Sequence, residues 1–167
     1  MISFDNLKRK VLKRKRIAMG LFDNLLNTVP AEKKYTPEDI REAYSVVLYC
    51  CANAEGNVGD EEIIFIDCLF QTMLIFKDYD GAEYLQIAEK AYSNYSAEEL
   101  LQGSIGFVKE SIRPQLFCYC CDIFLADGIV TEEEKKILEK IAELSGIDQE
   151  TTKKIVEVAL IRNVKHE

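Results

Sequence analysis

The chain has 167 residues, of which 48% are apolar and 30% charged, and its net charge is −8. This length and composition suit one globular domain with a full core and argue against a disordered chain. No apolar run reaches the roughly 18–20 residues of a membrane-spanning helix, and the N-terminus lacks the pattern of a secretory signal. We therefore expect a cytoplasmic protein with no direct membrane span.

The charge is unevenly distributed along the chain. Residues 1–18 carry +6 and the remainder −14. An acidic body argues against a nucleic-acid partner, because phosphate binding needs basic groups, and favours cations or basic proteins. Protein partners are expected, including a membrane-associated complex that would place the protein at the inner face of the membrane. Since Met19-Gly20-Leu21-Phe22 resembles a fresh start, we divide the chain into a basic segment, 1–18, which is either disordered or not native, and a domain, 19–167.

Helix signals begin after residue 35. Thr36-Pro37 reads as an N-cap followed by proline at the first helical position, and predicts a helix over about 37–54. A second helix is expected to open at Asp60-Glu61-Glu62, where acidic residues favour the positive end of the helix dipole.

The rest of the chain continues the helical pattern. Helices are expected over 82–92, from Ser96, over 115–126, from Thr131 to Leu144, and after Asp148. No segment alternates as a strand would. The sequence predicts an all-α, single helical-bundle domain of about seven or eight helices.

A nine-residue pattern occurs twice, 72 positions apart. The first copy is Ala54-Glu55-Gly56-Asn57-Val58-Gly59-Asp60-Glu61-Glu62, and the second is Ala126-Asp127-Gly128-Ile129-Val130-Thr131-Glu132-Glu133-Glu134. In each copy an apolar helix runs into an acidic residue and a glycine, and carboxylates open the next helix. The pattern indicates an internal duplication with an acidic corner in each half.

The two corners admit two interpretations. Packed together, they would offer oxygen ligands to a divalent cation, with calcium the first choice; the candidate ligands are Glu55, Asp60, Glu62, Asp127, Glu132 and Glu134. Alternatively, the glycine ends one helix and the carboxylates only cap the next. A true EF-hand is not expected, because Ile123 and Leu125 occupy the places of its first carboxylates.

The two copies and the Met19-Gly20-Leu21-Phe22 opening resemble the TerB tellurite-resistance family over roughly 19–165. The resemblance implies a duplicated all-helical fold, an acidic surface linked to divalent metals, and a non-enzymatic binding or scaffold role in tellurite resistance or stress response. Glu55 and Gly59 depart from the second copy, which has Asp127 and Thr131 at those places.

Other chemistry has weaker support. Cys118 and Cys121 have the spacing of a zinc or redox pair, yet within an apolar helix such thiols more often pack as small hydrophobes. His166, the single histidine, lies next to the last residue. We expect no enzyme, no catalytic residue and no bound organic cofactor. Two alternatives stay open: a metal-independent interaction module with an acidic docking surface, and an enzyme that uses the carboxylates or these two cysteines.

Overall fold

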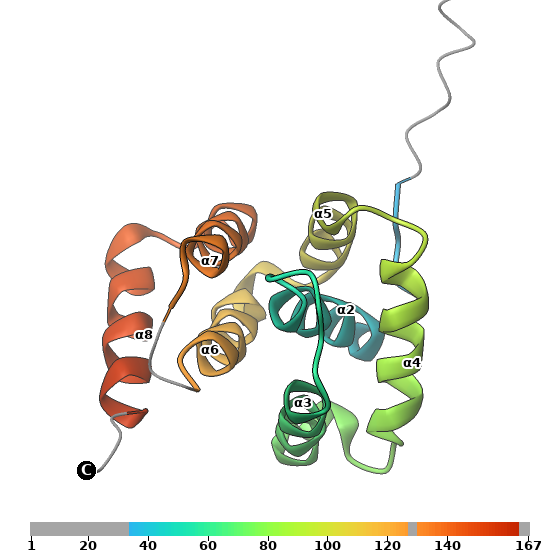
Figure 1. Cartoon of the computed structure of the whole chain (residues 1–167). Coiled ribbons are helices and arrows are strands. Elements are labelled where there is room, and N and C mark those ends of the chain that lie inside the picture. The colour runs from blue at the N-terminus through green and yellow to red at the C-terminus, as the bar shows by residue number, and fades with distance from the viewer. Residues whose placement is uncertain (1–33, 127–129, 164–167) are drawn as a thin grey trace, which may run out of the picture. The chain divides into compact units, whose positions relative to one another are not determined.

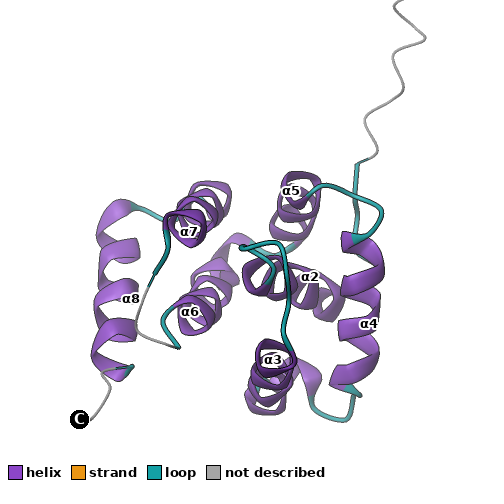
Figure 2. Ribbon diagram, viewed as in Figure 1, coloured by secondary structure: helices purple, strands orange, loops and turns teal. Residues whose placement is uncertain are grey.

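The computed structural model describes residues 34–126 and 130–163, which fall in one compact unit beginning at Lys34. Within these ranges all regular structure is helical (Figure 2), which confirms the all-α prediction. The seven α-helices are α2 (Ile40–Ala52), α3 (Asp60–Thr72), α4 (Gly81–Tyr92), α5 (Ala97–Phe107), α6 (Arg113–Phe124), α7 (Glu132–Ser145) and α8 (Gln149–Arg162). Short 3-10 turns cover Leu74–Phe76 and Glu110–Ile112.

Several predictions concern other residues. Segment 1–18, the opening at Met19, Asp127 and His166 lie outside the described residues. No helix within the described ranges has the length and hydrophobicity that a membrane crossing requires.

The duplication is visible in the helix bounds and in their packing. Helices α3 and α7 begin at residues 60 and 132, and α2 and α6 end at 52 and 124, so the 72-residue offset holds at both places. The contacts are reciprocal as well: α3 packs against α6, α7 packs against α2, and α2 and α6 pack against each other. Figure 1 shows α4 beside α2 and, in the other half, α8 beside α6. The two halves are therefore structural repeats.

Helix α2 is the centre of the described unit. It packs against α4, α5 and α6, and eight of its 13 residues are buried, including Tyr44, Val47 and Leu48. A helix that is apolar on most of its circumference is stable only when it is enclosed by others. This enclosure requires the two repeats to share one core.

The start of α2 differs from the prediction. The helix begins at Ile40, and its N-cap is Asp39 instead of Thr36. The Asp39 carboxylate accepts hydrogen bonds from the backbone N–H groups of Arg41 (2.8 Å) and Glu42 (2.9 Å), and so satisfies two of the four free donors of the first turn. Charge-assisted bonds of this kind are stronger than those a threonine hydroxyl accepts.

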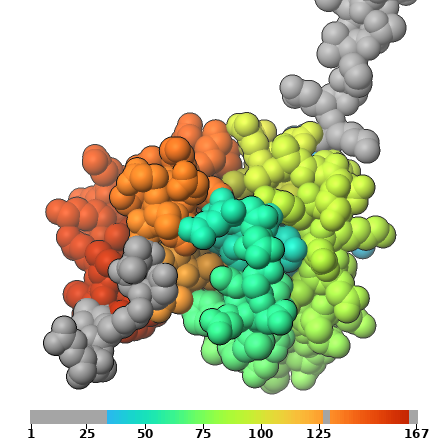
Figure 3. Space-filling model, viewed as in Figure 1, coloured from blue at the N-terminus to red at the C-terminus, as the bar shows by residue number. Residues whose placement is uncertain are grey.

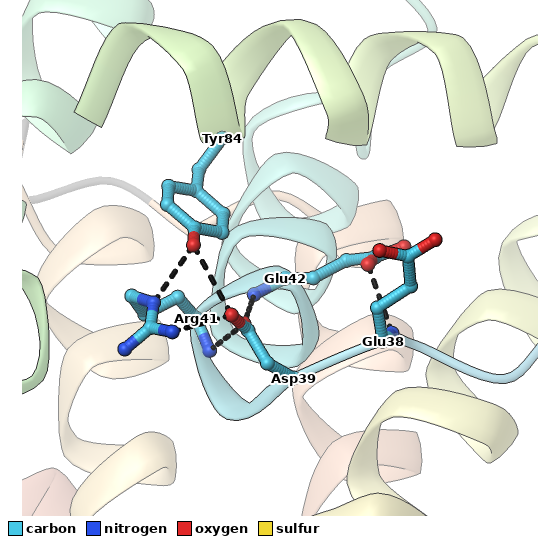
Figure 4. A network of polar contacts seen from close by, with 5 residues as sticks. All are labelled: Glu38, Asp39, Arg41, Glu42 and Tyr84. Atoms are coloured by element: carbon cyan, nitrogen blue, oxygen red, sulfur yellow. Dashed lines mark hydrogen bonds and ion pairs between the residues drawn. The ribbon is translucent and has the colours of Figure 1, made fainter. Parts of the chain in front are cut away.

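A polar network joins this helix start to α4 (Figure 4). Arg41 Nε donates to the Tyr84 hydroxyl (2.8 Å), which donates to Asp39 Oδ2 (3.1 Å), and the Arg41 guanidinium also pairs with Asp39 (2.6 Å). These hydrogen bonds hold the pKa of Asp39 below its usual range against the opposing effect of burial. Because each member bonds the others, we assign the network a structural role.

Three other caps agree with the sequence. Ser96 with Glu99 and Thr131 with Glu134 both form reciprocal capping boxes, and Asp148 caps α8. Gly146 ends α7 in the left-handed region, at φ 64°, a conformation that glycine adopts at little cost.

Replacing Thr131 by alanine is expected to lower the free energy of unfolding by about 1 kcal/mol, because the N–H group of Glu134 loses its hydroxyl acceptor. Urea denaturation at neutral pH measures the change. Thr152→Ala, within α8, is the control; it is expected to cause no loss, since alanine has the higher helix propensity. Equal losses in both variants would contradict the capping role.

Candidate functional site

The two acidic corners meet at one cavity, which we call the junction cavity. Its volume is about 420 Å³. Figure 3 shows, side by side on one face, the turn after α2 and the segment that opens α7. The cavity is lined by Cys51, Ala52, Ala54, Glu55, Asn57, Glu61, Glu62, Phe65, Ile123, Ala126, Thr131 and Glu134. Both repeats therefore contribute to a single site.

The lining is chemically divided. Apolar groups come from the ends of α2 and α6 and from Phe65 of α3, whereas the polar groups belong to the turns and to the first turns of α3 and α7. Glu55, Glu61 and Glu62 are exposed and Glu134 is half-buried. The cavity thus combines an apolar lining with four carboxylates.

Two of these carboxylates occupy equivalent capping positions, 72 residues apart. Glu134 accepts hydrogen bonds from the Thr131 backbone N–H (2.7 Å) and hydroxyl (3.1 Å). In the first repeat Glu62 folds back over the N-cap Gly59, since a Cβ added there would lie 2.5 Å from Glu62 Oε2. The predicted capping role is confirmed for Glu134.

The structure separates the predicted site residues into two groups. Glu55, Glu62 and Glu134 line the junction cavity, whereas Asp60 and Glu132, the first residues of α3 and α7, are not among its lining residues. Glu132 is exposed and pairs with Lys135, whose hydrogen bond lowers the pKa of that glutamate.

Other lining residues were not predicted. Asn57, Glu61 and Thr131 belong to the two copies of the motif but were not among the predicted ligands. The side chains of Asn57 and Thr131 are uncharged, so the acidic pattern did not identify them as ligands. Glu61 belongs to that pattern and could have been included with its acidic neighbours.

The described carboxylates do not form a ready metal centre. Within residues 34–126 and 130–163 no three histidine, cysteine, aspartate or glutamate side chains are grouped as metal ligands. Glu134 is already occupied by its capping bonds. Asp127, the remaining predicted ligand, lies outside these ranges.

Four thiols lie in the core near the packing of α2 on α6. Cys50, Cys51, Cys120 and Cys121 are buried and free, and Cys51 is in hydrogen-bond contact with Cys120. Burial raises the pKa of Cys50 and of Cys121 to about 12 and holds that of Cys51 well above its ordinary value. Thiols kept protonated in this way are poor nucleophiles and poor metal ligands.

The remaining cysteines are more accessible. Cys118 is half-buried and Cys68 is exposed. The Cys118 and Cys121 pair thus joins a half-buried thiol to a fully enclosed one, as the packing interpretation expects.

Over residues 34–126 and 130–163, the fold and the site together define an all-helical unit with two repeats and an acidic cavity between them. No protein-family model, curated protein or solved structure matches this chain.

Proposed function

We propose that the protein is a non-enzymatic binding module whose junction cavity receives a lysine or arginine side chain from a basic partner protein. The observation that carries the proposal is the division of the cavity into an apolar lining and four carboxylates. Lysine and arginine have the matching division, since an apolar stem carries a charged head.

The charge of the molecule supports the same ligand class. Residues after the basic segment carry −14, and such a field speeds the approach of a basic partner. The cavity volume also lies within the range of about 300–1,000 Å³ that is usual for ligand sites. A partner that inserts one side chain would gain both burial of its stem and pairing of its charge.

The test uses a fluorescein-labelled helical peptide of lysine and leucine, titrated into the full chain and followed by fluorescence anisotropy. The double variant Glu55→Gln/Glu61→Gln is expected to weaken binding about fivefold, because two exposed charge pairs are lost at roughly 0.5 kcal/mol each. Added salt is expected to weaken binding to the unaltered chain.

The matched control is Glu133→Gln/Glu139→Gln. It removes the same charge from exposed positions on α7 that do not line the cavity, and binding is expected to stay within about twofold. An equal loss in both double variants would show that only net charge matters and would overturn the site.

A divalent cation, with calcium first, is the second candidate ligand. It is favoured by the convergence of equivalent carboxylates from both repeats, Glu62 and Glu134, on one cavity. Bound metal would stabilise the fold by about 2.7 kcal/mol at a free concentration one hundred times Kd. Calorimetric titration of calcium, and separately of zinc, is expected to give saturable heats that Asp127→Asn/Glu134→Gln abolishes. Flat heats with an unchanged Tm would reject this candidate.

The resemblance to TerB proteins supplies the proposed setting. We place the module in a cytoplasmic tellurite-resistance or stress-response system, as a scaffold component that reaches the membrane through its partners. Comparing tellurite tolerance with and without the gene, and with the Glu55→Gln/Glu61→Gln chain, tests that setting; unchanged tolerance in every case would reject it.

A further inference from the structure

An apolar groove lies between α6 and α8, away from the junction cavity, and we call it the α8 groove. Its volume is about 280 Å³. It is lined by Cys118, Asp122, Lys154, Ile155, Val158, Ala159 and Arg162. Val158 is 60% exposed, and Ile161, three residues further along α8, is 75% exposed. These are large apolar side chains that the described part of the chain does not cover.

The other repeat shows how the equivalent region is covered. Helix α4, the counterpart of α8, packs against α2, α3 and α5, whereas within the described ranges α8 packs mainly against α6. Helix α5 lies against α2 and α7 (Figure 1). In the correspondence between the two repeats, α6 is the counterpart of α2 and α3 is the counterpart of α7. The second repeat therefore has a position equivalent to that of α5, beside α6 and α3.

The residue register places the α8 groove at this position. Tyr35 and Cys50 of α2 belong to the same buried core cluster, and the Tyr35 carbonyl would lie 2.1 Å from a Cβ at Gly103 of α5. Asp122, a groove residue, is 72 positions after Cys50. It is nearly buried, and its carboxylate pairs with Arg162 of α8.

Within the described ranges, helix α3 is uncovered on the surface that corresponds to the α7 contact with α5. Lys140 of α7 pairs with Glu98 of α5 at 3.5 Å. The α3 residue 72 positions before Lys140 is Cys68, which is exposed, and one turn earlier lies Ile64, which is 62% exposed. Lys140 of α7 thus contacts α5, whereas the corresponding surface of α3 carries the exposed side chains of Cys68 and Ile64.

We propose that the α8 groove binds an acidic amphipathic helix of another protein, in the position equivalent to that of α5. The apolar face of that helix covers Ile155 and Val158. Its carboxylates meet Lys154 and Arg162 at the rim; these pair with Glu150 and Asp122 but keep 67% and 58% of their side chains exposed, so each can contact a second carboxylate. Helix α5 is the internal precedent for an acidic helix at this position, because Ala97–Phe107 contains two glutamates and no basic residue, and Glu98 pairs with a lysine of α7. Helix-in-groove binding of this kind uses apolar anchors spaced three and four residues apart.

The probe is a labelled synthetic peptide with the sequence of residues 95–108, which spans α5 and its caps. It is titrated into the full chain and followed by fluorescence anisotropy. Binding is expected to saturate and to weaken at least about tenfold in Val158→Glu, since one buried aliphatic side chain is worth more than 1.4 kcal/mol. Lys154→Glu is expected to weaken binding by a smaller factor that shrinks as salt is added.

Leu160→Glu is the matched control. Leu160 is also on α8 and is 50% exposed. It lies two residues after Val158, and helical residues at that spacing point in nearly opposite directions, so it does not line the groove. Peptide binding is expected to stay within about twofold. Both substitutions are at exposed positions, and circular dichroism verifies that each variant is folded.

Three results would overturn the proposal. The first is a peptide that does not bind saturably, and the second is binding that Val158→Glu leaves intact, which would mean exchange with α5 itself. The third is self-association of the full chain in sedimentation that Val158→Glu abolishes and Leu160→Glu does not, which would assign the groove to a second copy of this protein.

Discussion

Raising the pH above 9 is expected to lower the free energy of unfolding steeply, so that the protein unfolds at about pH 11. Burial raises the pKa of Cys50 and Cys121 from an ordinary 9.0 to about 12. The unfolded chain therefore releases these protons at a pH where the native state retains them. Their contribution is complete below pH 9 and is lost as the pH rises toward 12.

The expected size follows from proton linkage. Between pH 9 and 12 each such thiol lowers the free energy of unfolding by about 1.4 kcal/mol per pH unit, so the two together lower it by roughly 3 kcal/mol per pH unit. Cys51, whose pKa is also raised by burial, adds to this slope, and Tyr44, with a pKa raised to about 12, adds to it above pH 10. Urea denaturation at several pH values, with a reductant present, measures the slope.

A pair of cysteine variants isolates the cause. Cys50→Ala is expected to reduce the slope by about 1.4 kcal/mol per pH unit, whatever it does to stability at neutral pH. Cys68→Ser changes an exposed thiol and is expected to leave the slope unaltered. A slope that is the same in both variants would show that alkaline unfolding has another origin.

Replacing Phe117 by alanine is expected to lower the free energy of unfolding by about 3–5 kcal/mol. Phe117 lies on α6, is fully buried, and belongs to the core shared by the two repeats. The loss combines the transfer of an aromatic ring to water with the cavity that remains. Because domains of this size are stable by only about 5–15 kcal/mol, the substitution would remove a large part of the free energy of unfolding. Urea denaturation gives the value.

Two further variants keep this expectation testable. Phe117→Leu, which preserves most of the volume, is expected to cost about 1.5 kcal/mol or less, so it reports on the site even where the alanine variant does not fold. Phe107→Ala, at a phenylalanine that is 43% exposed, is expected to cost less than about 1 kcal/mol. Equal costs at Phe117 and Phe107 would contradict the burial argument.

Most helix boundaries could be predicted because they are encoded locally. The capping boxes at Ser96 and Thr131 and the stop at Gly146 each depend on a few adjacent residues. The start of α2 was predicted wrongly, because two cap signals overlap there. Asp39 prevails over Thr36 because its carboxylate also pairs with the neighbouring Arg41 and makes a long-range hydrogen bond with Tyr84 of α4.

The candidate site was predictable in part. The duplication suggested that the acidic corners would meet, and Glu55, Glu62 and Glu134 do line one cavity. Asp60 and Glu132 were grouped with them because they are close in sequence. Residues two apart on a helix point about 200° apart, so a cavity lined by the third residue of α3 or of α7 excludes the first. The apolar half of the cavity depends on tertiary packing and has no local signal.

The packing of α2 against α6 also bears on how such a chain can be assembled. Helices α2 and α6 cover each other, so one repeat alone would leave that face exposed unless it paired with a second copy of itself or with another protein. The present polypeptide joins the two partners covalently, at a fixed one-to-one ratio. Since they are no longer identical, one half can keep α5 while the described residues of the other leave a groove uncovered, a difference that a symmetric pair of identical chains could not maintain.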